Sequence, residues 1–490
     1  MQNDLTTGSV FRNVVSFSLP YLLSYFLQTL YGMADLFIIG QFEGVASTTA
    51  VSIGSQVMHM LTVMLVGLAM GVTVSIAQAA GGGDKKRTAS AIGNTVTLFM
   101  LLSLALTALL LALRGGIVSI MSTPEEAVQG TLAYLTVCFI GIPFITAYNI
   151  IASIFRGLGD SKSPMYFIAV ACVVNIALDY YFMGTLHLGP AGAALGTTLS
   201  QAVSVLVSLA VILKRRLISV RRADFRPQRT VMGKLLQIGV PVALQDGFIQ
   251  VSFVIITIIA NRRGLTDAAA VGIVEKIIGF LFLIPSSMLS TVSALGAQNI
   301  GAGKPERARL TLRYAAMIAR SFGIAVVILT LFIAEPLGEI TLIHSPALRL
   351  FWIDTALTAP DYSALELSTS RLAAAQAEAL VFLGKVGFSV SQEHLNVGSF
   401  GQYDGEFLVL DEADRFTGDV IDLPASLCAC VRFRGHHAES LAQYRRLMQF
   451  IREEGCTAAG FSREITVIDY GFTTDTEKFV TEIMIPLQKV

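Results

Sequence analysis

The sequence predicts a bundle of helices embedded in a membrane, followed by a smaller soluble domain that mixes helices and strands. Hydrophobic residues make up 53% of the 490 residues and charged residues only 14%, which is little charge for a soluble chain of this length. Long apolar runs fill the first part of the chain. Residues 1–340 carry 23 Lys and Arg against 15 Asp and Glu, whereas residues 341–490 carry 12 against 20. The two parts therefore differ in charge as well as in hydropathy.

The apolar runs of the first part are long enough to cross a bilayer, which takes about 20 helical residues. Nine such runs lie at roughly 14–40, 46–80, 92–113, 127–155, 164–186, 190–213, 235–261, 270–300 and 311–334. Alternate links between them are rich in Lys and Arg, as in "GGGDKKRT" and "GAGKPERARLTLR". Because basic links tend to stay in the cytoplasm, we expect a multi-pass protein of a bacterial inner or plasma membrane, surrounded by lipid, with a cytoplasmic N-terminus.

The seventh run begins a repeat of the first six. Pro20 corresponds to Pro241, and Ala77-Gln78 corresponds to Ala297-Gln298, at offsets of 221 and 220 positions. Duplicated bundles are typical of secondary transporters, which bind their substrates between the two halves. The predicted domains are a first lobe, a basic cytoplasmic linker, a partial second lobe and a C-terminal domain, at 1–213, 214–234, 235–340 and 341–490.

Several segments together resemble the multidrug and toxic compound extrusion (MATE) family. They include "LPYLLSYFLQTLYGMADLFIIGQF", "RGLGDSKSPMY", "NIALDYYF", "GPAGAALGTTLSQ" and "AQNIGAGK", and the resemblance covers residues 1 to about 338. It implies twelve spans in two bundles of six, so the last three spans are missing here and the second lobe is incomplete. It also implies antiport of lipophilic cationic compounds against H⁺ or Na⁺, without a cofactor.

Two carboxyl groups lie deep in apolar runs, Asp35 in the first and Asp179 in the fifth. Asn175 precedes Asp179 by one helical turn and shares its helix face. A charged side chain at a helix centre costs about 2.5–3.5 kcal/mol on insertion scales, so each acid needs a partner, a proton or a cation. The resemblance implies a cation-coupling site here and adds Thr197. The alternative is that these side chains only hold helices together.

Weaker candidates for a substrate cavity lie in three runs. Aromatic and polar side chains there are suited to bulky cations, and the candidates are Tyr31, Gln245, Asp246 and Glu275. For Glu275, an ion pair with a neighbouring residue is an equally good interpretation.

Residues 341–490 have a soluble pattern. Apolar, β-branched segments such as "GEFLVLDEAD", "SLCACVRFRG" and "FVTEIMIPL" predict strands, and amphipathic helices are predicted at 363–382 and 438–454. A compact α+β domain follows. The segments "ALVFLGKVGFSVSQEHL", "YRRLMQFIREEG" and "SREITVIDYGFTTDTEKF" resemble the GyrI-like effector-binding domain, which often follows the DNA-binding head of MerR-type multidrug regulators. The acidic balance of this part argues against binding to nucleic acid.

That second resemblance implies a drug site around a buried glutamate in the penultimate strand, a position that Glu464 matches. Rings that stack on a lipophilic cation are sought among Trp352, Phe433 and Tyr470. The alternative is that Glu464 is a surface acid paired with an arginine such as Arg432. Glu482 is a weaker candidate for the same drug-binding role, and solvent exposure is its default interpretation. We interpret His436-His437 as a solvated turn.

The predicted function is drug export by antiport, with an appended drug-binding domain. The alternatives are a membrane-anchored sensor that transports nothing and a gene fusion without function. Nine spans and a cytoplasmic N-terminus would put the C-terminal domain outside the cell, unless one run does not cross or the chain joins two reading frames. We find no phosphate-binding loop, nucleophile constellation or metal-binding cluster, so we expect no enzyme, and the oligomeric state is left open.

Overall fold

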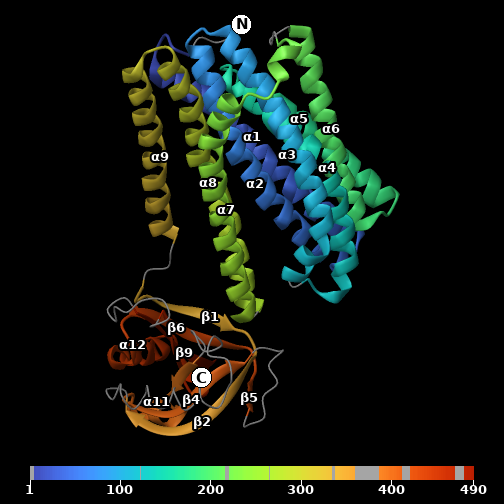
Figure 1. Ribbon diagram of the computed structural model, residues 1–490. Coiled ribbons are helices and arrows are strands. Elements are labelled where there is room, and N and C mark those ends of the chain that lie inside the picture. The colour runs from blue at the N-terminus through green and yellow to red at the C-terminus, as the bar shows by residue number, and fades with distance from the viewer. Residues whose placement is uncertain are drawn as a thin grey trace. The chain divides into compact units, whose positions relative to one another are not determined.

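The computed structural model describes residues 5–121, 123–215, 220–263, 265–333, 337–358, 386–410, 420–468 and 479–489 of the chain. The chain divides into two compact units (Figure 1). The membrane unit comprises Met1–Ile255 and Val274–Val326, and the C-terminal unit comprises Ile256–Ile273 and Val327–Val490. Most of the long helices belong to the first unit and all described strands belong to the second.

Nine helices of the described residues are long and apolar enough to cross a membrane. They are α1 (Val10–Phe42), α2 (Val45–Gly81), α3 (Lys85–Ile120), α4 (Glu125–Gly157), α5 (Lys162–Asp179), α6 (Gly189–Arg215), α7 (Arg229–Arg263), α8 (Leu265–Gly301) and α9 (Pro305–Ile333). A π-helix, η1 (Tyr180–Thr185), continues α5, and a short 3-10 helix, η2 (Arg222–Phe225), precedes α7. A helix satisfies its own backbone polar groups, which lipid cannot do. The predicted membrane bundle of about nine helices is confirmed.

Helix α4 forms the centre of the first lobe. Of its most apolar stretch, 72% is buried, more than in any of the other eight candidate spans. It packs against α2, α3 and α6, and α1 packs against α5. A core of side chains from these helices includes Tyr134, Leu135, Cys138 and Phe139. The first lobe is therefore built around a helix with little lipid contact.

The repeat predicted from the sequence is visible in the helices themselves. Helices α2 and α8 are both 37 residues long, and α8 begins and ends 220 positions after α2. The turns that follow them contain glycines with nearly the same positive φ, 70° at Gly83 and 71° at Gly303. Pro20 and Pro241 both lie inside their helices, α1 and α7. Helices α2 and α8 therefore share their length and the glycine turn that follows them.

The ends of α2 and α8 touch through equivalent residues. An added Cβ on Gly81 would overlap the carbonyl oxygen of Gln298, and one on Gly301 would overlap the carbonyl oxygen of Gln78. The offset of 220 positions relates these two contacts to each other, so the approach is reciprocal. Gln298 also donates a hydrogen bond from Nε2 to the carbonyl oxygen of Gly157, at 2.9 Å. Only glycine allows the two helices to come this close.

The C-terminal unit is an antiparallel sheet covered by a helix. Its strands are β1 (Ile340–Ser345), β2 (Leu348–Thr358), β3 (Val386–Ser389), β4 (Gln402–Leu410), β5 (Val420–Leu423), β6 (Ser426–Arg434), β7 (Cys456–Ala458), β8 (Arg463–Ile468) and β9 (Val480–Lys489). The strand order is β1-β6-β9-β8-β3-β4-β2-β5, and β7 pairs with β9. The helices are α11 (Gln392–Val397), η4 (His437–Glu439) and α12 (Ser440–Glu453). The predicted α+β domain is confirmed.

Helix α12 covers one face of this sheet. Its apolar residues recur at helical spacing and pack against strand residues such as Phe388, Val431 and Ile483; they are Tyr444, Leu447, Met448 and Ile451. This helix corresponds to the one predicted at 438–454. The helix predicted at 363–382 lies outside the described residues.

The contact between α2 and α8 makes a testable prediction. Gly301→Val should force the ends of the two helices apart, and overpacking of this kind typically costs about 1–3 kcal/mol. Thermal unfolding of the purified full chain in detergent measures the loss. The matched control is Gly296→Val on the same helix, where an added Cβ meets only Val292 at 3.8 Å. Equal losses in both variants would contradict a specific contact.

Candidate functional site

A cluster of buried polar side chains lies between α1, α5 and α6. Asp35 of α1 is 3% exposed, and its Oδ2 accepts a hydrogen bond from Thr197 Oγ1 of α6 at 3.1 Å. Asn175 and Asp179, both of α5, are also buried. Asp35 interacts with Asp179, and both acids interact with Asn175. The structure thus brings the four predicted coupling residues together inside the first lobe.

Asp179 lies against α6 at Gly196, a residue that the sequence analysis did not select. An added Cβ on Gly196 would overlap Asp179 Oδ1. Directly after Asp179 the helix widens into η1, where the N–H of Leu186 donates to the carbonyl oxygen of Tyr181, five residues earlier, at 3.0 Å. Such wide turns are frequent at functional sites. In the sequence, the only indication of this contact is that Gly196 is a glycine directly before Thr197.

Several polar atoms of the cluster have no hydrogen-bond partner among the described residues. They are Asp35 Oδ1, both carboxyl oxygens of Asp179, Asn175 Oδ1 and Nδ2, and Oε1 of the buried Gln201. Each unsatisfied buried polar group costs about 1–3 kcal/mol, so a proton, an ion or water is needed here. The oxygen atoms suit a proton or a hard cation. Within the described ranges, no group of three or more His, Cys, Asp or Glu could hold a metal ion.

Of the weaker candidates, Tyr31 adjoins this cluster. It precedes Asp35 by one turn of α1 and interacts with both Asp35 and Gln201. Gln201 follows Thr197 by one turn of α6 and was missed because a lone glutamine in an apolar run carries no motif. The cluster thus extends along both helices.

The other three candidates lie in the second lobe. Asp246 of α7 is partly exposed, and its Oδ2 would lie 2.9 Å from an added Cβ on Gly67 of α2. Gln245 is exposed and Glu275 of α8 is partly exposed. No described contact joins Gln245 or Asp246 to the four coupling residues.

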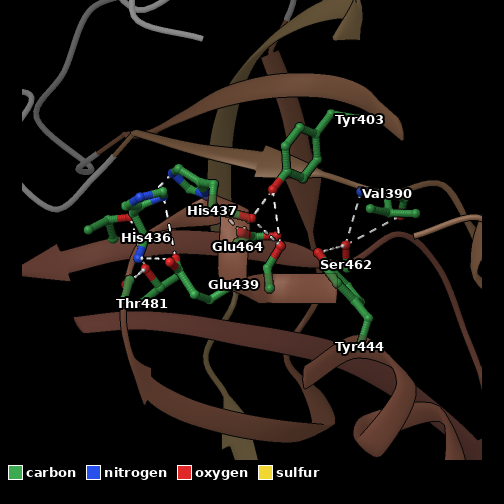
Figure 2. Close-up of polar contacts among 12 residues, drawn as sticks. Val390, Tyr403, His436, His437, Glu439, Tyr444, Ser462, Glu464 and Thr481 are labelled. Carbon is green, nitrogen blue, oxygen red and sulfur yellow. Dashed lines mark hydrogen bonds and ion pairs between the residues drawn. The ribbon is translucent and has the colours of Figure 1, made fainter. Parts of the chain in front are cut away.

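In the C-terminal unit, Glu464 of β8 is fully buried. Its Oε1 accepts a hydrogen bond from Tyr403 Oη at 2.9 Å and lies 2.7 Å from His437 Nδ1. Figure 2 shows both partners pointing toward the carboxyl group. Its other oxygen, Oε2, is buried without a partner in the described part of the chain. The interpretation as a surface acid paired with Arg432 is wrong, because Arg432 pairs with Glu482.

Two residues that the sequence analysis expects to be exposed, His437 and Glu482, are buried. His437 is only 8% exposed, and its Nε2 lies 3.2 Å from Thr466 Oγ1. The turn after β6, with φ of 119° at Gly435, leads into η4 and directs the ring against Phe388, at 4.8 Å between ring centres. The default interpretation of Glu482 as exposed is also wrong: this residue is equally buried, because its strand β9 is paired with β6 on one side and β8 on the other. Neighbours distant in sequence decide both cases.

Two buried tyrosines keep their protons beside Glu464. Burial raises the pKa of Tyr403 well above its usual value, and the negative charge of Glu464 adds to this effect. The pKa of Tyr444 of α12 is raised for the same two reasons. Tyr444 Oη also lies 2.8 Å from Ser462 Oγ (Figure 2). Both phenols therefore stay neutral hydrogen-bond donors across the physiological pH range.

The predicted aromatic residues do not all surround Glu464. Phe433 lies in the core under α12, as do Phe388 and Tyr403. Trp352 lies on the other face of the sheet. It pairs with Phe407, whereas Glu464 belongs to the next row of paired residues, which contains Phe388. Successive rows of a sheet point to opposite faces. Trp352 stacks on Phe407 at 6.4 Å between ring centres. Tyr470 lies outside the described residues.

Glu406 is a second buried acid on the face of Glu464, and the sequence analysis missed it. It is fully buried in β4 and pairs with Phe388, which in turn pairs with Glu464. The signal was a glutamate inside the apolar stretch "GEFLVL". One row of the sheet thus presents two acids separated by a ring.

Comparison with known proteins agrees with this architecture. The MatE family profile matches residues 20–181 and 241–347. The chain belongs to the MatE family. A second profile, the GyrI-like small molecule binding domain, matches residues 339–488. Both predicted resemblances are confirmed, and the protein is a multi-pass membrane protein of the MatE family with a GyrI-like domain at 339–488.

Individual relatives resemble the MatE part. The probable multidrug resistance protein YpnP of Bacillus subtilis is 31% identical over 306 residues, which cover 62% of this chain and 68% of YpnP. The probable multidrug resistance protein YoeA of the same organism is 28% identical over 313 residues, covering 62% and 68%. Among solved structures, a MOP superfamily transporter from Pyrococcus furiosus superposes with a TM-score of 0.62 at 26% identity, covering 67% of this chain and 74% of that one.

The close contact at Gly196 predicts a functional defect. In Gly196→Ala the new Cβ displaces the carboxyl group of Asp179. If that carboxyl group couples transport to an ion, as the sequence analysis expects, efflux should fall, by up to about 100-fold for a displacement of about 1 Å. Efflux of a fluorescent lipophilic cation from proteoliposomes measures it. The control is Gly40→Ala on α1, where an added Cβ meets nothing within 4 Å. Normal efflux from Gly196→Ala would contradict the importance of this contact.

Proposed function

We propose that the MatE part of the chain exports lipophilic cationic compounds in exchange for H⁺ or Na⁺. The carboxyl groups of Asp35 and Asp179 hold the coupling ion, and Asn175 and Thr197 complete its site. The observation that carries this proposal is the set of buried oxygen atoms without partners in the first lobe. Relatives whose names include multidrug resistance support the substrate class.

The coupling step follows from the charge of the cluster. Two carboxylates side by side in a low-dielectric bundle repel each other unless a proton or a cation neutralises them. Binding at one membrane face and release at the other therefore change the electrostatic energy of the first lobe. Thr197 follows these changes because it donates to Asp35 across the α1–α6 contact. Movement of α1 and α5 against α6 is then linked to the ion.

We propose that the N-terminus and the ends of α2 and α8 face the cytoplasm. The basic residues after these helices include Lys85, Lys86 and Lys304, and basic links favour that side. The reciprocal glycine contact then closes the cytoplasmic side of the space between the lobes. A switch of access requires this contact to open.

Asp179→Asn provides the direct test of coupling. The amide keeps the size of the side chain but cannot bind a proton or neutralise a cation, so export should fall by at least about tenfold, equivalent to 1.4 kcal/mol. Efflux of ethidium from proteoliposomes with an imposed H⁺ or Na⁺ gradient measures it. The control is Asp84→Asn, an exposed helix cap that accepts from the N–H of Arg87 at 2.9 Å and that asparagine replaces well.

Full export by Asp179→Asn would refute the coupling site. An intact chain that binds cations through its C-terminal domain but exports none would favour the second candidate function, a membrane-anchored sensor. The observation in favour of a sensor is that the GyrI-like domain contains its own buried acid, in a unit compact by itself.

For the GyrI-like domain we propose that Glu464 binds a lipophilic cation. Burying a carboxylate costs free energy unless a positive group or a hydrogen-bond donor contacts it. In the structure, Tyr403 and His437 are these partners of Glu464. A cation that enters the site takes the place of His437 on Oε1 or pairs with Oε2. Phe388 and Phe433 lie in the same core and offer aromatic surface.

Glu464→Gln should therefore remove one class of cation site from the full chain. Its affinity for tetraphenylphosphonium should fall by at least about tenfold, because a neutral amide cannot balance the charge. Equilibrium dialysis of the intact protein counts the sites. Trp352→Phe is the control, since Trp352 lies on the opposite sheet face and should leave binding unchanged. Trp352 is also the sole tryptophan, so its emission reports whether the domain of Glu464→Gln is folded.

A further inference from the structure

The imidazole of His437 is the partner of Glu464 that can carry a positive charge (Figure 2). Its Nδ1 lies 2.7 Å from Glu464 Oε1, and the other group that contacts this oxygen is the neutral phenol of Tyr403. Arg463, the neighbour of Glu464 on β8, points to the opposite face of the sheet, where it donates to Ser345 Oγ at 2.9 Å. Among the described residues, the charge of Glu464 is therefore balanced by His437 or not at all.

A chain of hydrogen bonds leads from the far side of this ring to a carbonyl group. His437 Nε2 lies 3.2 Å from Thr466 Oγ1, which lies 3.1 Å from Thr481 Oγ1. The Thr481 hydroxyl in turn donates to the carbonyl oxygen of Gly435 at 2.8 Å. The chain thus runs from η4 to β8 and β9 and returns to the turn before η4.

The carbonyl group at its end fixes the direction of every bond in this chain. A carbonyl oxygen only accepts, so the hydroxyl hydrogen of Thr481 is directed at Gly435. Thr481 Oγ1 then accepts from Thr466, and the single hydroxyl hydrogen of Thr466 is used in that bond. Thr466 Oγ1 can only accept from His437, so Nε2 of the ring carries a hydrogen.

The other ring nitrogen carries a hydrogen as well. A carboxylate only accepts hydrogen bonds, so Nδ1 of His437 donates to Glu464. An imidazole with hydrogens on both nitrogens is the positively charged form of histidine. The network therefore describes a buried ion pair, in which a cation of the protein itself neutralises Glu464.

We propose that a cation binds at Glu464 in exchange for a proton of His437. A ligand cation beside the intact ion pair would place two positive charges on one buried carboxylate, which is unfavourable. Release of the proton removes one of these charges: the Nδ1–H bond breaks, its electron pair stays on the nitrogen, and the proton passes to water or a buffer base. This exchange rests on the proposed cation site at Glu464 and adds its regulation by pH.

Other ionisable side chains near the ring come from four elements; they are Tyr403 and Glu406 of β4, Tyr444 of α12, Glu464 of β8, and His436 and Glu439 at η4. The two phenols keep their protons, because burial and the charge of Glu464 raise the pKa of each. The two side chains at η4 are partly exposed and lie 3.5 Å from each other. Strand alternation places the arginines of β6 and β8 on the opposite face. A variant of His437 separates this ring from the two buried acids.

Tetraphenylphosphonium is a suitable probe, because it keeps its charge at every pH. Equilibrium dialysis of the intact chain and of Glu464→Gln gives two isotherms, and the sites lost in the variant are those at Glu464. Exchange of one proton makes their affinity rise by up to about tenfold per pH unit while His437 titrates. The total rise should be at least about tenfold between about pH 5 and about pH 8, the range in which histidine changes charge.

His437→Asn should remove this pH dependence, because the amide keeps a hydrogen-bond donor but never carries a charge. The matched control is His394→Asn in the same domain. His394 also contacts a carboxyl group, with its Nδ1 2.8 Å from Asp404 Oδ1, but it has no described contact with Glu464. The control should keep the wild-type pH profile.

Thr466 is a positioning residue in this scheme, and its variants test the chain of hydrogen bonds. Thr466→Val removes the acceptor of the Nε2 hydrogen, so His437 should lose its proton more readily and the binding profile should shift to lower pH. Thr466→Ser keeps the acceptor and should leave the profile in place.

Two results would overturn the exchange. One is a pH dependence that persists in His437→Asn, which would assign the proton to a buried acid. The other is wild-type binding that neither changes with pH nor releases a proton in calorimetry with two buffers of different ionisation enthalpy, a result that requires no variant to fold. In both cases the probe still binds at Glu464, so the proposed cation site stands. Identical isotherms for the wild type and Glu464→Gln would instead refute that site and the exchange with it.

Discussion

A buried charge needs a partner, and this requirement shapes both units of the protein. In the membrane unit, Asp35 accepts a hydrogen bond from Thr197 and both acids interact with Asn175, but one oxygen of Asp35 and both carboxyl oxygens of Asp179 have no partner among the described residues. In the GyrI-like domain, Glu464 is held by a phenol and an imidazole. The aspartate site in the membrane unit has unsatisfied oxygen atoms, so it is suited to bind an ion or a proton. The glutamate site in the GyrI-like domain is nearly complete, so a ligand must compete with groups of the protein itself.

The duplicated lobes meet through close backbone contacts at the ends of α2 and α8, and also through side chains such as Tyr21 of α1 and Met288 of α8. Glycines at the ends of α2 and α8 let carbonyl oxygens of each helix approach the other, and the same offset relates both contacts. Small residues also let α2 and α7 pack closely, since an added Cβ on Gly71 would overlap the carbonyl oxygen of Leu235. Packing of this kind is typical of membrane helices, which gain little from hydrophobic burial in lipid.

The two units solve different problems with the same residue types. Lipid removes water from the backbone, so the MatE part uses long helices that satisfy themselves. The GyrI-like domain faces water and buries its apolar residues between a sheet and α12. Its polar network of Tyr403, His437 and Glu464 is drawn from three segments far apart in sequence. Pairing of β4 with β3 and of β3 with β8 brings the strands of Tyr403 and Glu464 together, and η4, which follows β6, supplies His437.

The sequence by itself determined the nine helices, the repeat, both family resemblances and the depth of Asp35 and Asp179, because hydropathy and local motifs encode all of these. It also selected Glu464. Only the tertiary structure decided which side chains meet: Gly196 against Asp179, His437 on Glu464, and Trp352 on the opposite sheet face. Register places Trp352 and Glu464 apart, and a shift of one residue would reverse that result. Periodicity gives each residue a face, but long-range pairing decides which faces come together.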